Sequence, residues 1–232
     1  MEIRLLLSDS HPCSYLDKQQ ATTAFVDPGL KLSSYQISKL AELGFRRSGP
    51  YLYRPECQHC QSCIAARIPV QRFKTTRSQK RNFKRFHHLR PILKPLDQLS
   101  DEHYDLYQRY INRRHQDGDM YPPERSQFDN FLANPGNNTF LMEYRDREKL
   151  VGTAVTDRLD NALSSIYTIF DPAEAYSGLG VYAILRQIEQ ARQEQLPHLY
   201  LGYWIKECKK MAYKLDYRPI ELLTENGWVS LS

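Results

Sequence analysis

Three strand-like runs of apolar residues follow one another in the second half of the chain, separated by short polar turns. They are Thr139–Tyr144, Leu150–Thr156 and Ala162–Phe170. Helical spacing then appears after Ser177–Gly180, and the side chains that share its apolar face are Val181, Ile184, Leu185 and Ile188. His198–Tyr203 predicts a further strand.

This order of a strand meander, one helical crossover and a returning strand is that of N-acetyltransferase-like folds. The strand after such a crossover returns parallel to its neighbour. In these folds the two parallel strands splay, and the N-terminus of the helix points into the gap. We therefore expect a gap that suits an acyl donor with phosphates nearby.

The first half reads as loop, short helix and strands. A helix is predicted over 34–43 with Gly44 at its end, and strands over 51–54 and 65–70. A basic helix over 79–89 ends before Pro91, and helices over 101–115 and 208–215 are expected later. Since 93–100 resembles a linker, we expect two modules, residues 1–98 and 99–232.

Composition is that of a soluble globular protein, with 41% apolar and 25% charged residues among 232. The sequence contains no run of about 18 apolar residues, so it predicts no membrane helix. Met1–Ser8 has only three consecutive leucines and is no signal peptide, so we expect a cytoplasmic protein. In that reducing compartment the five cysteines should not form disulfides.

Positive charge is concentrated in one block of the sequence. Residues 57–96 hold ten Lys/Arg and no Asp or Glu, whereas the rest of the chain has a net charge of −5. Such a local field favours a polyanion as partner. The cations expected to contact tRNA phosphates are Arg72, Lys74, Arg77, Lys80, Arg81, Lys84 and Arg85. The interleaved Phe73, Phe83 and Phe86 are better explained as one buried helix face than as stacking platforms.

Three cysteines, Cys57, Cys60 and Cys63, have the spacing of metal ligands, and Cys13 could supply a fourth thiolate. A structural zinc or an iron–sulfur cluster and a set of ordinary reduced thiols are both consistent with this pattern. A catalytic cysteine is less favoured, because the spacing implies no His or Asp partner.

Further candidates surround the predicted gap. Ser177, Gly178 and Gly180 could bind an anion through backbone N–H groups. Tyr167 and Asp171 end the presumed splayed strand and are candidate catalytic residues, although Asp171-Pro172 also suits a simple turn. Candidate substrate-binding residues after the last strand are Tyr203, Trp204, Lys206, Lys209 and Lys210.

Several runs together resemble the arginyltransferase family of aminoacyl-tRNA–protein transferases, and within it the short bacterial aspartate/glutamate leucyltransferases. They include Cys13-Ser-Tyr-Leu16, Phe45–Gly49, Tyr53–Cys57, Arg67–Val70, Tyr167–Pro172, Ser177–Gly180, Tyr200–Ile205 and Cys208–Met211. The resemblance covers essentially the whole chain. One departure is that Leu16 stands where eukaryotic members have the second cysteine of a Cys-x-x-Cys pair.

The resemblance implies an α+β fold of two N-acetyltransferase-like (duplicated GNAT) modules, each a mixed sheet flanked by helices. It also implies transfer of leucine from leucyl-tRNA to proteins with N-terminal Asp or Glu, which marks them for N-degron proteolysis. The chemistry needs no cofactor, and we expect a monomer. Arginine is the alternative donor amino acid, and a non-catalytic zinc-containing RNA-binding protein or an acetyl-CoA-dependent enzyme are alternative functions.

Selection of an acidic acceptor requires a fixed cation. The nearest lysines to the gap are Lys206 with Lys209 or Lys210, which would share a helical face. Arg46 and Arg47 are the next candidates. The acceptor α-amine has a pKa near ~8, so alignment of amine and ester matters more than a strong base.

Overall fold

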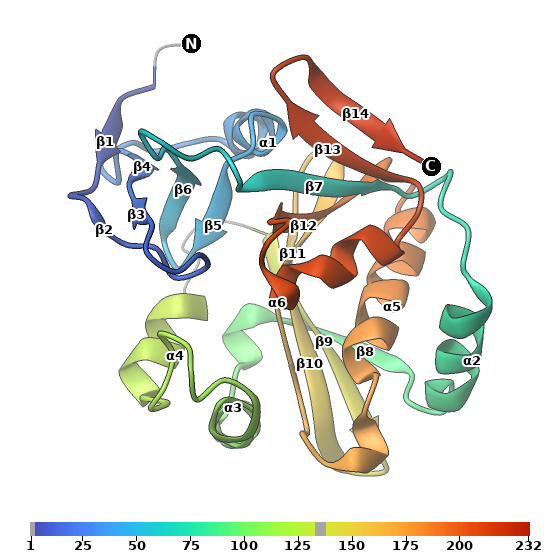
Figure 1. Ribbon diagram of the computed structural model, residues 1–232. Helices are drawn as coiled ribbons and strands as arrows, with labels where there is room; N and C mark the ends of the chain where they lie inside the picture. The colour runs from blue at the N-terminus through green and yellow to red at the C-terminus, as the bar shows by residue number, and fades with distance from the viewer. Residues whose placement is uncertain (1–2, 133–137) are drawn as a thin grey trace.

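The computed structural model describes residues 3–132 and 138–232, so the first two residues of the opening segment Met1–Ser8 lie outside the described residues. Two sheets of unequal size lie side by side in it (Figure 1). No helix within these ranges is long and apolar enough to cross a bilayer.

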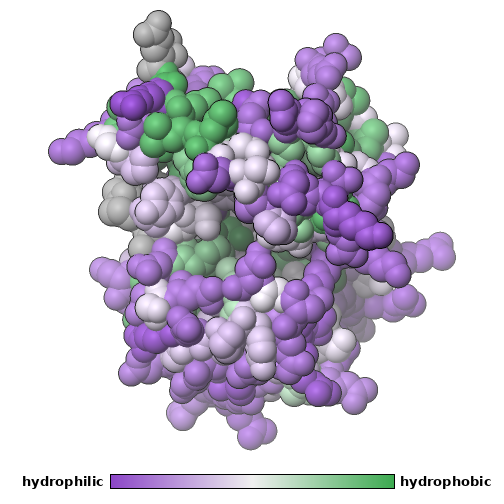
Figure 2. Space-filling view, turned by 60° about the vertical axis from the view of Figure 1, so that its left-hand side comes forward, coloured by the Kyte–Doolittle hydropathy of each residue, from purple (hydrophilic) through white to green (hydrophobic). Residues whose placement is uncertain are grey.

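The small sheet is antiparallel throughout and has the order β1-β4-β6-β5. Its strands are β1 (Leu5–Leu7), β4 (Thr23–Val26), β5 (Arg46–Ser48) and β6 (Tyr51–Pro55). Its core is formed by Val26 and Phe45 with Leu40 of the covering helix α1 (Ser34–Glu42). The leucines of the edge strand β1 are exposed and form an apolar patch at the top of the face seen in Figure 2.

The large sheet has the order β14-β13-β7-β12-β11-β10-β9-β8. Its strands are β7 (Ile64–Pro69), β8 (Pro91–Pro95), β9 (Asn138–Asp146), β10 (Lys149–Arg158), β11 (Ala162–Phe170), β12 (His198–Trp204), β13 (Ile220–Thr224) and β14 (Gly227–Leu231). Among the described strands, only β11 and β12 run parallel to each other. A two-stranded ribbon of β2 (His11–Pro12) and β3 (Gln20–Ala21) stands apart.

Helices cover both faces of the large sheet. These helices are α2 (Arg77–Phe86), α3 (Asp101–Arg114), α4 (Arg125–Leu132), α5 (Leu179–Gln193) and α6 (Lys209–Ala212). Figure 1 shows α5 on one face with α2 outside it, and α3 on the other. The strands β9 and β10 are apolar on both faces of the sheet. One large core therefore joins the sheet to the helices on either side of it.

The α+β class and the acetyltransferase-like order of the second half are confirmed: β9, β10 and β11 form the meander, α5 crosses over and β12 returns parallel. The small sheet differs from the expected mixed sheet, because all its neighbouring strands are antiparallel. The modules 1–98 and 99–232 stay a prediction. In the structure, the first half contributes β7 and β8 to the large sheet.

The predicted helices over 34–43, 79–89 and 101–115 are confirmed with shifted ends. The basic helix starts two residues early because Thr76 caps it, with a reciprocal contact to Gln79. Its last residue is Phe86, well before Pro91, which instead begins β8. The predicted final helix contains only α6 and the 3-10 turn Tyr213–Asp216.

Candidate active site

An opening lies where β11 and β12 stop pairing. Their parallel register covers only Ala162–Ser164 against His198–Tyr200. Each strand carries an irregularity at this level on its other side, between β10 and β11 and between β12 and β7. Bulges bend and twist a strand, so the two strands diverge beyond this point. The splay expected from the sequence is therefore present.

Arg46 of β5 lies at the point of divergence. Its guanidinium donates to the hydroxyl Oγ of Ser164 at 2.9 Å and to the carbonyl oxygen of Ser165 at 2.6 Å. A Cβ atom on Gly202 would lie 3.4 Å from two guanidinium nitrogens, and Gly202 has φ +80°, so glycine suits this close approach. Within the described residues no carboxylate forms an ion pair with Arg46. A partly buried cation at the opening is thus left uncompensated.

Arg47 points to the opposite face of the same strand and has a structural role. Its guanidinium binds both carboxylate oxygens of Asp157, at 2.7 and 2.9 Å, and donates to the carbonyl of Gly49. Thr139 donates to the same carboxylate. Both charged side chains are almost fully buried. Arg47 therefore ties β5 to β10 and, unlike Arg46, is already neutralised.

Tyr203 joins the two sheets beside the opening. Its hydroxyl donates to the carbonyl of Gly44 at 2.8 Å, and its ring lies 6.1 Å from that of Tyr53. Burial raises the pKa of Tyr203, which keeps the phenol neutral. Trp204 packs against Ala66 and Ile220 under the C-terminal hairpin, in a hydrophobic cluster rather than at the opening.

Lys214 is a residue near the opening that the sequence analysis did not single out. It lies in the 3-10 turn after α6, is 3% exposed, and donates to the carbonyl of Tyr203 and to Sδ of Met211. Burial, followed by the Arg46 charge, lowers its pKa to about 7. Its sequence context, a lysine between Tyr213 and Leu215, gives no signal of burial, because the surrounding groups come from distant segments.

Tyr167 and Asp171 occupy different environments at the far end of β11. Tyr167 lies in an aromatic wall with Tyr110 and Phe131, and burial raises its pKa, so its hydroxyl is a donor rather than a base. Asp171 pairs with Lys149 at 2.8 Å and accepts from the N–H of Ala173. Although burial opposes ionisation, these contacts lower the pKa of Asp171. The contact with Ala173 is that of a simple turn at Asp171-Pro172, which was the alternative to a catalytic role.

The N-terminus of α5 is covered by α2. Asn82 donates to the carbonyl of Gly178 at 3.0 Å, and a Cβ atom on Gly178 would lie 2.6 Å from the Asn82 amide nitrogen. Arg85 donates to the carbonyls of Ser177 and Ala175. Gly180 packs against the ring of Phe170. Close packing is therefore sufficient to explain why Gly178 and Gly180 are glycines.

The three candidate lysines near α6 lie at the surface, whereas Arg46 is partly buried. Lys206 precedes the helix instead of lying in it, so it does not share a helical face with Lys209 or Lys210 as expected. All three are exposed. Lys210 is paired with Asp117 at 2.7 Å. Exposed cations of this kind are screened by solvent and select weakly.

The cations predicted to bind tRNA form an exposed surface around α2. Phe73 and Phe86 are buried and Phe83 is partly buried against Tyr182, which confirms that the rings form the inner face. A groove of about 410 Å³ between α2 and α5 has Phe73 and Phe83 in its floor and Lys80 and Lys84 at its rim. Arg72 contacts Ser230 and lies 3.9 Å from Glu221. The remaining cations of the set are Lys74, Arg77, Arg81 and Arg85.

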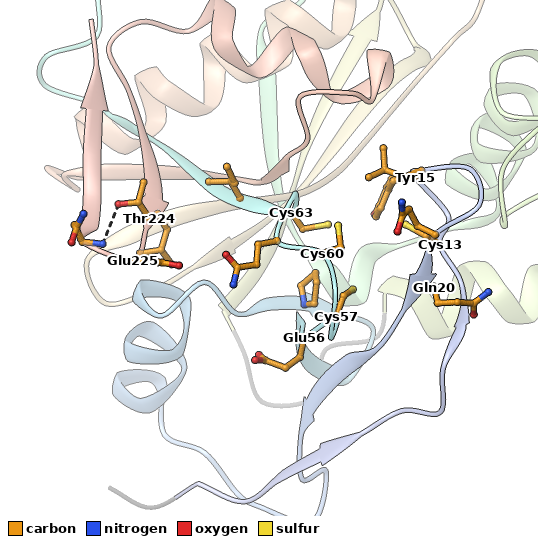
Figure 3. A pocket seen from close by; sticks show the side chains of 16 residues that line it. Cys13, Tyr15, Gln20, Glu56, Cys57, Cys60, Cys63, Thr224 and Glu225 are labelled. Carbon is orange, nitrogen blue, oxygen red and sulfur yellow. Dashed lines mark hydrogen bonds between the residues drawn. The ribbon is translucent and has the colours of Figure 1, made fainter.

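The four cysteines proposed as one cluster line the same cavity, which has a volume of about 510 Å³. Figure 3 shows Cys57, Cys60 and Cys63 on the connection before β7, with Cys13 across from them. All are free thiols. Burial, with the neighbouring cysteines, raises the pKa of Cys63 to about 12, and the Cys57 thiol donates to the carbonyl of Thr22 at 3.7 Å.

In this arrangement the cysteines do not fit a metal. Among the described residues, no three His, Cys, Asp or Glu side chains are arranged to hold an ion. The sequence correctly predicted that these four cysteines line one place. In the structure they are separate free thiols, not a set of metal ligands.

Both halves of the chain match the same family of known proteins. Residues 11–81 match the family described as "Arginine-tRNA-protein transferase, N terminus", and residues 102–224 match its C terminus. The "Aspartate/glutamate leucyltransferase" of Hahella chejuensis is 51% identical over 95% of this chain and 94% of its own length. The protein of the same name from Pseudomonas fluorescens (strain Pf0-1) is 50% identical over 99% of this chain and 97% of its own.

Solved structures resemble the chain more distantly. "The structure of L-PGS from Bacillus licheniformis" has a TM-score of 0.47 and 8% identity, over 73% of this chain and 50% of that one. The sequence matches span nearly the whole chain and include both halves. The chain therefore belongs to the arginine-tRNA-protein transferase family, within which it groups with the bacterial aspartate/glutamate leucyltransferases.

Proposed function

We propose that the chain transfers leucine from leucyl-tRNA to the α-amine of proteins that begin with Asp or Glu. The observation that carries this proposal is Arg46, a cation without a carboxylate partner among the described residues, at the divergence of the two parallel strands. The relatives named above support the donor and the acceptor. We further propose a cytoplasmic protein whose products enter N-degron proteolysis.

The reaction replaces an ester with an amide. The donor ester joins leucine to the terminal ribose of tRNA, and the neutral α-amine attacks its carbonyl carbon. The site has to align these two groups, which is worth several kcal/mol, up to about 7–11 in ideal cases. Backbone N–H groups of β11 and β12 that face the opening have no ladder partner there, since pairing ends at Ser164 and Tyr200. Such donors can stabilise the oxyanion of the tetrahedral intermediate.

Arg46 is the group best placed to read the acceptor side chain. A guanidinium binds a carboxylate through a planar pair of N–H groups, and in a partly buried position it is less screened than a surface lysine. An acceptor beginning with Ala would leave this cation without a partner. We therefore propose Arg46, rather than Arg47 or the exposed lysines, as the source of preference for Asp and Glu.

The basic surface of α2 is proposed to hold the tRNA. Its exposed cations can replace counterions along the phosphate backbone without reading sequence. The groove between α2 and α5 offers an apolar floor and a charged rim to an unpaired nucleotide. The identity of the donor amino acid has to be read near the opening, where the ester lies.

A transfer assay tests the function. The purified chain is given labelled Leu-tRNA, Arg-tRNA or acetyl-CoA together with peptides that begin with Asp, Glu, Ala or Lys. We expect label from Leu-tRNA on the Asp and Glu peptides only. Label from Arg-tRNA would make the chain an arginyltransferase, and label on no peptide despite tRNA binding would favour the non-catalytic RNA-binding alternative.

A structural metal on Cys13, Cys57, Cys60 and Cys63 requires these thiols to rearrange around the ion. Metal analysis of anaerobically purified protein decides it. One zinc or a small cluster per chain, lost together with thermal stability in Cys57→Ser, would establish such a site. Metal-free protein with full transfer activity would leave the cysteines as packed thiols.

A further inference from the structure

Lys214 is a buried amine whose two hydrogen-bond acceptors are both uncharged. One is the carbonyl oxygen of Tyr203, and the other is Sδ of Met211 at 3.0 Å. Within the described ranges no carboxylate pairs with it. A neutral primary amine has two N–H donors and one lone pair, so these two contacts match its neutral form and leave the lone pair available.

The charged and titratable groups around Lys214 come from several elements and favour that neutral form. Arg46 of β5 opposes an ammonium, whereas the ring of Tyr213, 5.8 Å away, favours one. Cys63, before β7, and Cys208, before α6, have the opposite effect, but burial dominates and the pKa falls to about 7. A buried amine without a counter-ion is expected to release its proton near neutral pH.

The contact with the Tyr203 carbonyl places the Lys214 amine beside the diverging part of β12. Tyr203 belongs to the part of β12 that has diverged from β11, whose pairing with β12 ends at Tyr200. The helix α6 and the turn that carries Lys214 follow directly and contact β12 (Figure 1). Arg46 lies on the other side, on the carbonyl of Ser165. An acidic N-terminal residue that binds Arg46 would therefore have Lys214 beside it.

Resting on the transfer reaction proposed above, we propose that Lys214 accepts the proton that the acceptor's α-ammonium must lose. The acceptor's own side-chain carboxylate then faces the ammonium formed on Lys214, next to Arg46. The group that activates the nucleophile thus becomes part of the pocket that reads the acidic side chain. Lys214 would contribute both to catalysis and to acceptor selection.

The step balances without a further reactant. The α-ammonium and the neutral Lys214 amine become a neutral α-amine and a Lys214 ammonium. The α-amine forms the C–N bond to the leucyl carbonyl, the C–O bond to ribose breaks, and the second proton of the amine passes to the leaving ribose oxygen. The Lys214 ammonium returns its proton to solvent after the product leaves.

Selection follows from the same charges. When the acceptor begins with Asp or Glu, its carboxylate offsets the ammonium that Lys214 becomes. When it begins with Ala, two buried cations would face each other without an anion, which opposes the proton transfer. Peptides without an acidic side chain should therefore bind weakly and also be activated poorly.

The test is the pH dependence of kcat/KM for an Asp peptide, measured with saturating Leu-tRNA between about pH 6 and 9. Lys214→Arg keeps a cation but cannot release its proton, and Lys214→Met removes both functions. Lys31→Met, at an exposed lysine before α1, is the matched control. Melting temperature and Leu-tRNA binding are recorded for each variant, because a role confined to packing would alter only these.

For the wild type we expect kcat/KM to rise with a midpoint near pH 7 and then to level off, because above the α-amine pKa of ~8 the amine is neutral without help. Lys214→Arg should instead rise roughly tenfold from pH 7 to 9, as the α-amine loses its proton by itself. Lys214→Met should also lose preference for Asp over Ala. A wild-type profile that rises with a midpoint near pH 8, like that of Lys214→Arg, or variants with a pH-independent loss, would overturn the inference. Wild type that transfers no leucine at any pH would instead overturn the proposed function.

Discussion

The exposed face of α2 and the opening between β11 and β12 both present cations without carboxylate partners in the described part of the chain, but in opposite surroundings. The α2 side chains extend into solvent from a capped helix. Arg46 and Lys214 are held by backbone carbonyls and are partly or fully buried. Solvent-exposed charges attract any polyanion and are screened by salt, whereas desolvated charges discriminate between single groups.

The two regions therefore differ in what they can provide: the α2 surface provides affinity for tRNA, and the opening provides selectivity for the acceptor side chain. The α2 surface can bind tRNA of any sequence, since it contacts phosphates. The opening can distinguish one carboxylate from a methyl group, because an unpaired buried cation is costly. Substitutions on either side of this division should therefore change different measured quantities.

Arg47→Ala tests whether the neighbour of Arg46 is structural. It leaves the buried carboxylate of Asp157 without its cation, which should lower the free energy of unfolding by about 3–5 kcal/mol. Denaturant unfolding measures the loss. A stability change below about 1 kcal/mol would mean that the two arginines differ less than their surroundings suggest.

Arg46→Met tests the opening itself. Transfer to the Asp peptide should fall by roughly 100-fold, about 3 kcal/mol of transition-state stabilisation, while Leu-tRNA binding and melting temperature stay nearly unchanged. Arg54→Met on β6, where the guanidinium already pairs with Glu56 at 2.7 Å, is the control and should be nearly silent. Equal losses in both variants would show that the small sheet, and not the lone cation, matters.

Lys214→Met tests whether burial of this amine costs stability. Folding lowers the pKa of Lys214 from 10.5 to about 7, so between these values the unfolded chain binds more protons and the folded state gains stability as pH rises. Relative to wild type, Lys214→Met should therefore be stabilised by roughly 2–4 kcal/mol more at pH 6 than near pH 10. Unfolding free energies at these pH values, with Lys31→Met for comparison, should differ in this direction. A pH-independent difference would contradict the lowered pKa.

The triple change Lys80→Ala, Arg81→Ala and Lys84→Ala tests the α2 surface. It should reduce the slope of log affinity for tRNA against log salt by about 0.7–0.9 for each phosphate that is no longer neutralised. The preference for peptides that begin with Asp over those that begin with Ala should not change. An equal charge reduction at the exposed Arg4, Lys31 and Arg113 is the control. If the slope falls equally in both triples, the effect is one of net charge rather than of a surface.

Lys210→Ala is expected to have the smallest effect. Its ammonium pairs with Asp117, which is 70% exposed, so solvent already screens it. Transfer to Asp and Ala peptides should stay within about twofold of wild type. A selective loss on the Asp peptide would return the acidic-residue pocket to the lysines after β12.

The meander, crossover and splay could be predicted because their signals are local. Apolar runs ended by polar turns mark β9–β11, and helical spacing marks α5. The hairpin of β13 and β14 was missed although Asn226-Gly227 is a turn signal of the kind that joins such strands. The placement of β7 between β12 and β13 could not be predicted, because it depends on pairing across most of the chain.

The site was predicted in part. Period-two geometry already implies that Arg46 and Arg47 face opposite sides of a strand, but not which side meets the opening. The sequence favoured Lys206, Lys209 and Lys210 because they follow β12 directly, yet the chain turns and leaves them exposed. Lys214 gave no signal, since its surroundings come from β5, β12 and the connection before β7.

The place of β7 also has a consequence for how the protein is made. This strand leaves the ribosome early, but its neighbours β12 and β13 belong to the last part of the chain. Until they arrive, both edges of β7 remain without their partners, and such edges are the ones that pair with foreign strands. During synthesis the nascent chain should therefore need a chaperone until its final residues emerge, and a ribosome stalled before β12 should leave a product prone to aggregation.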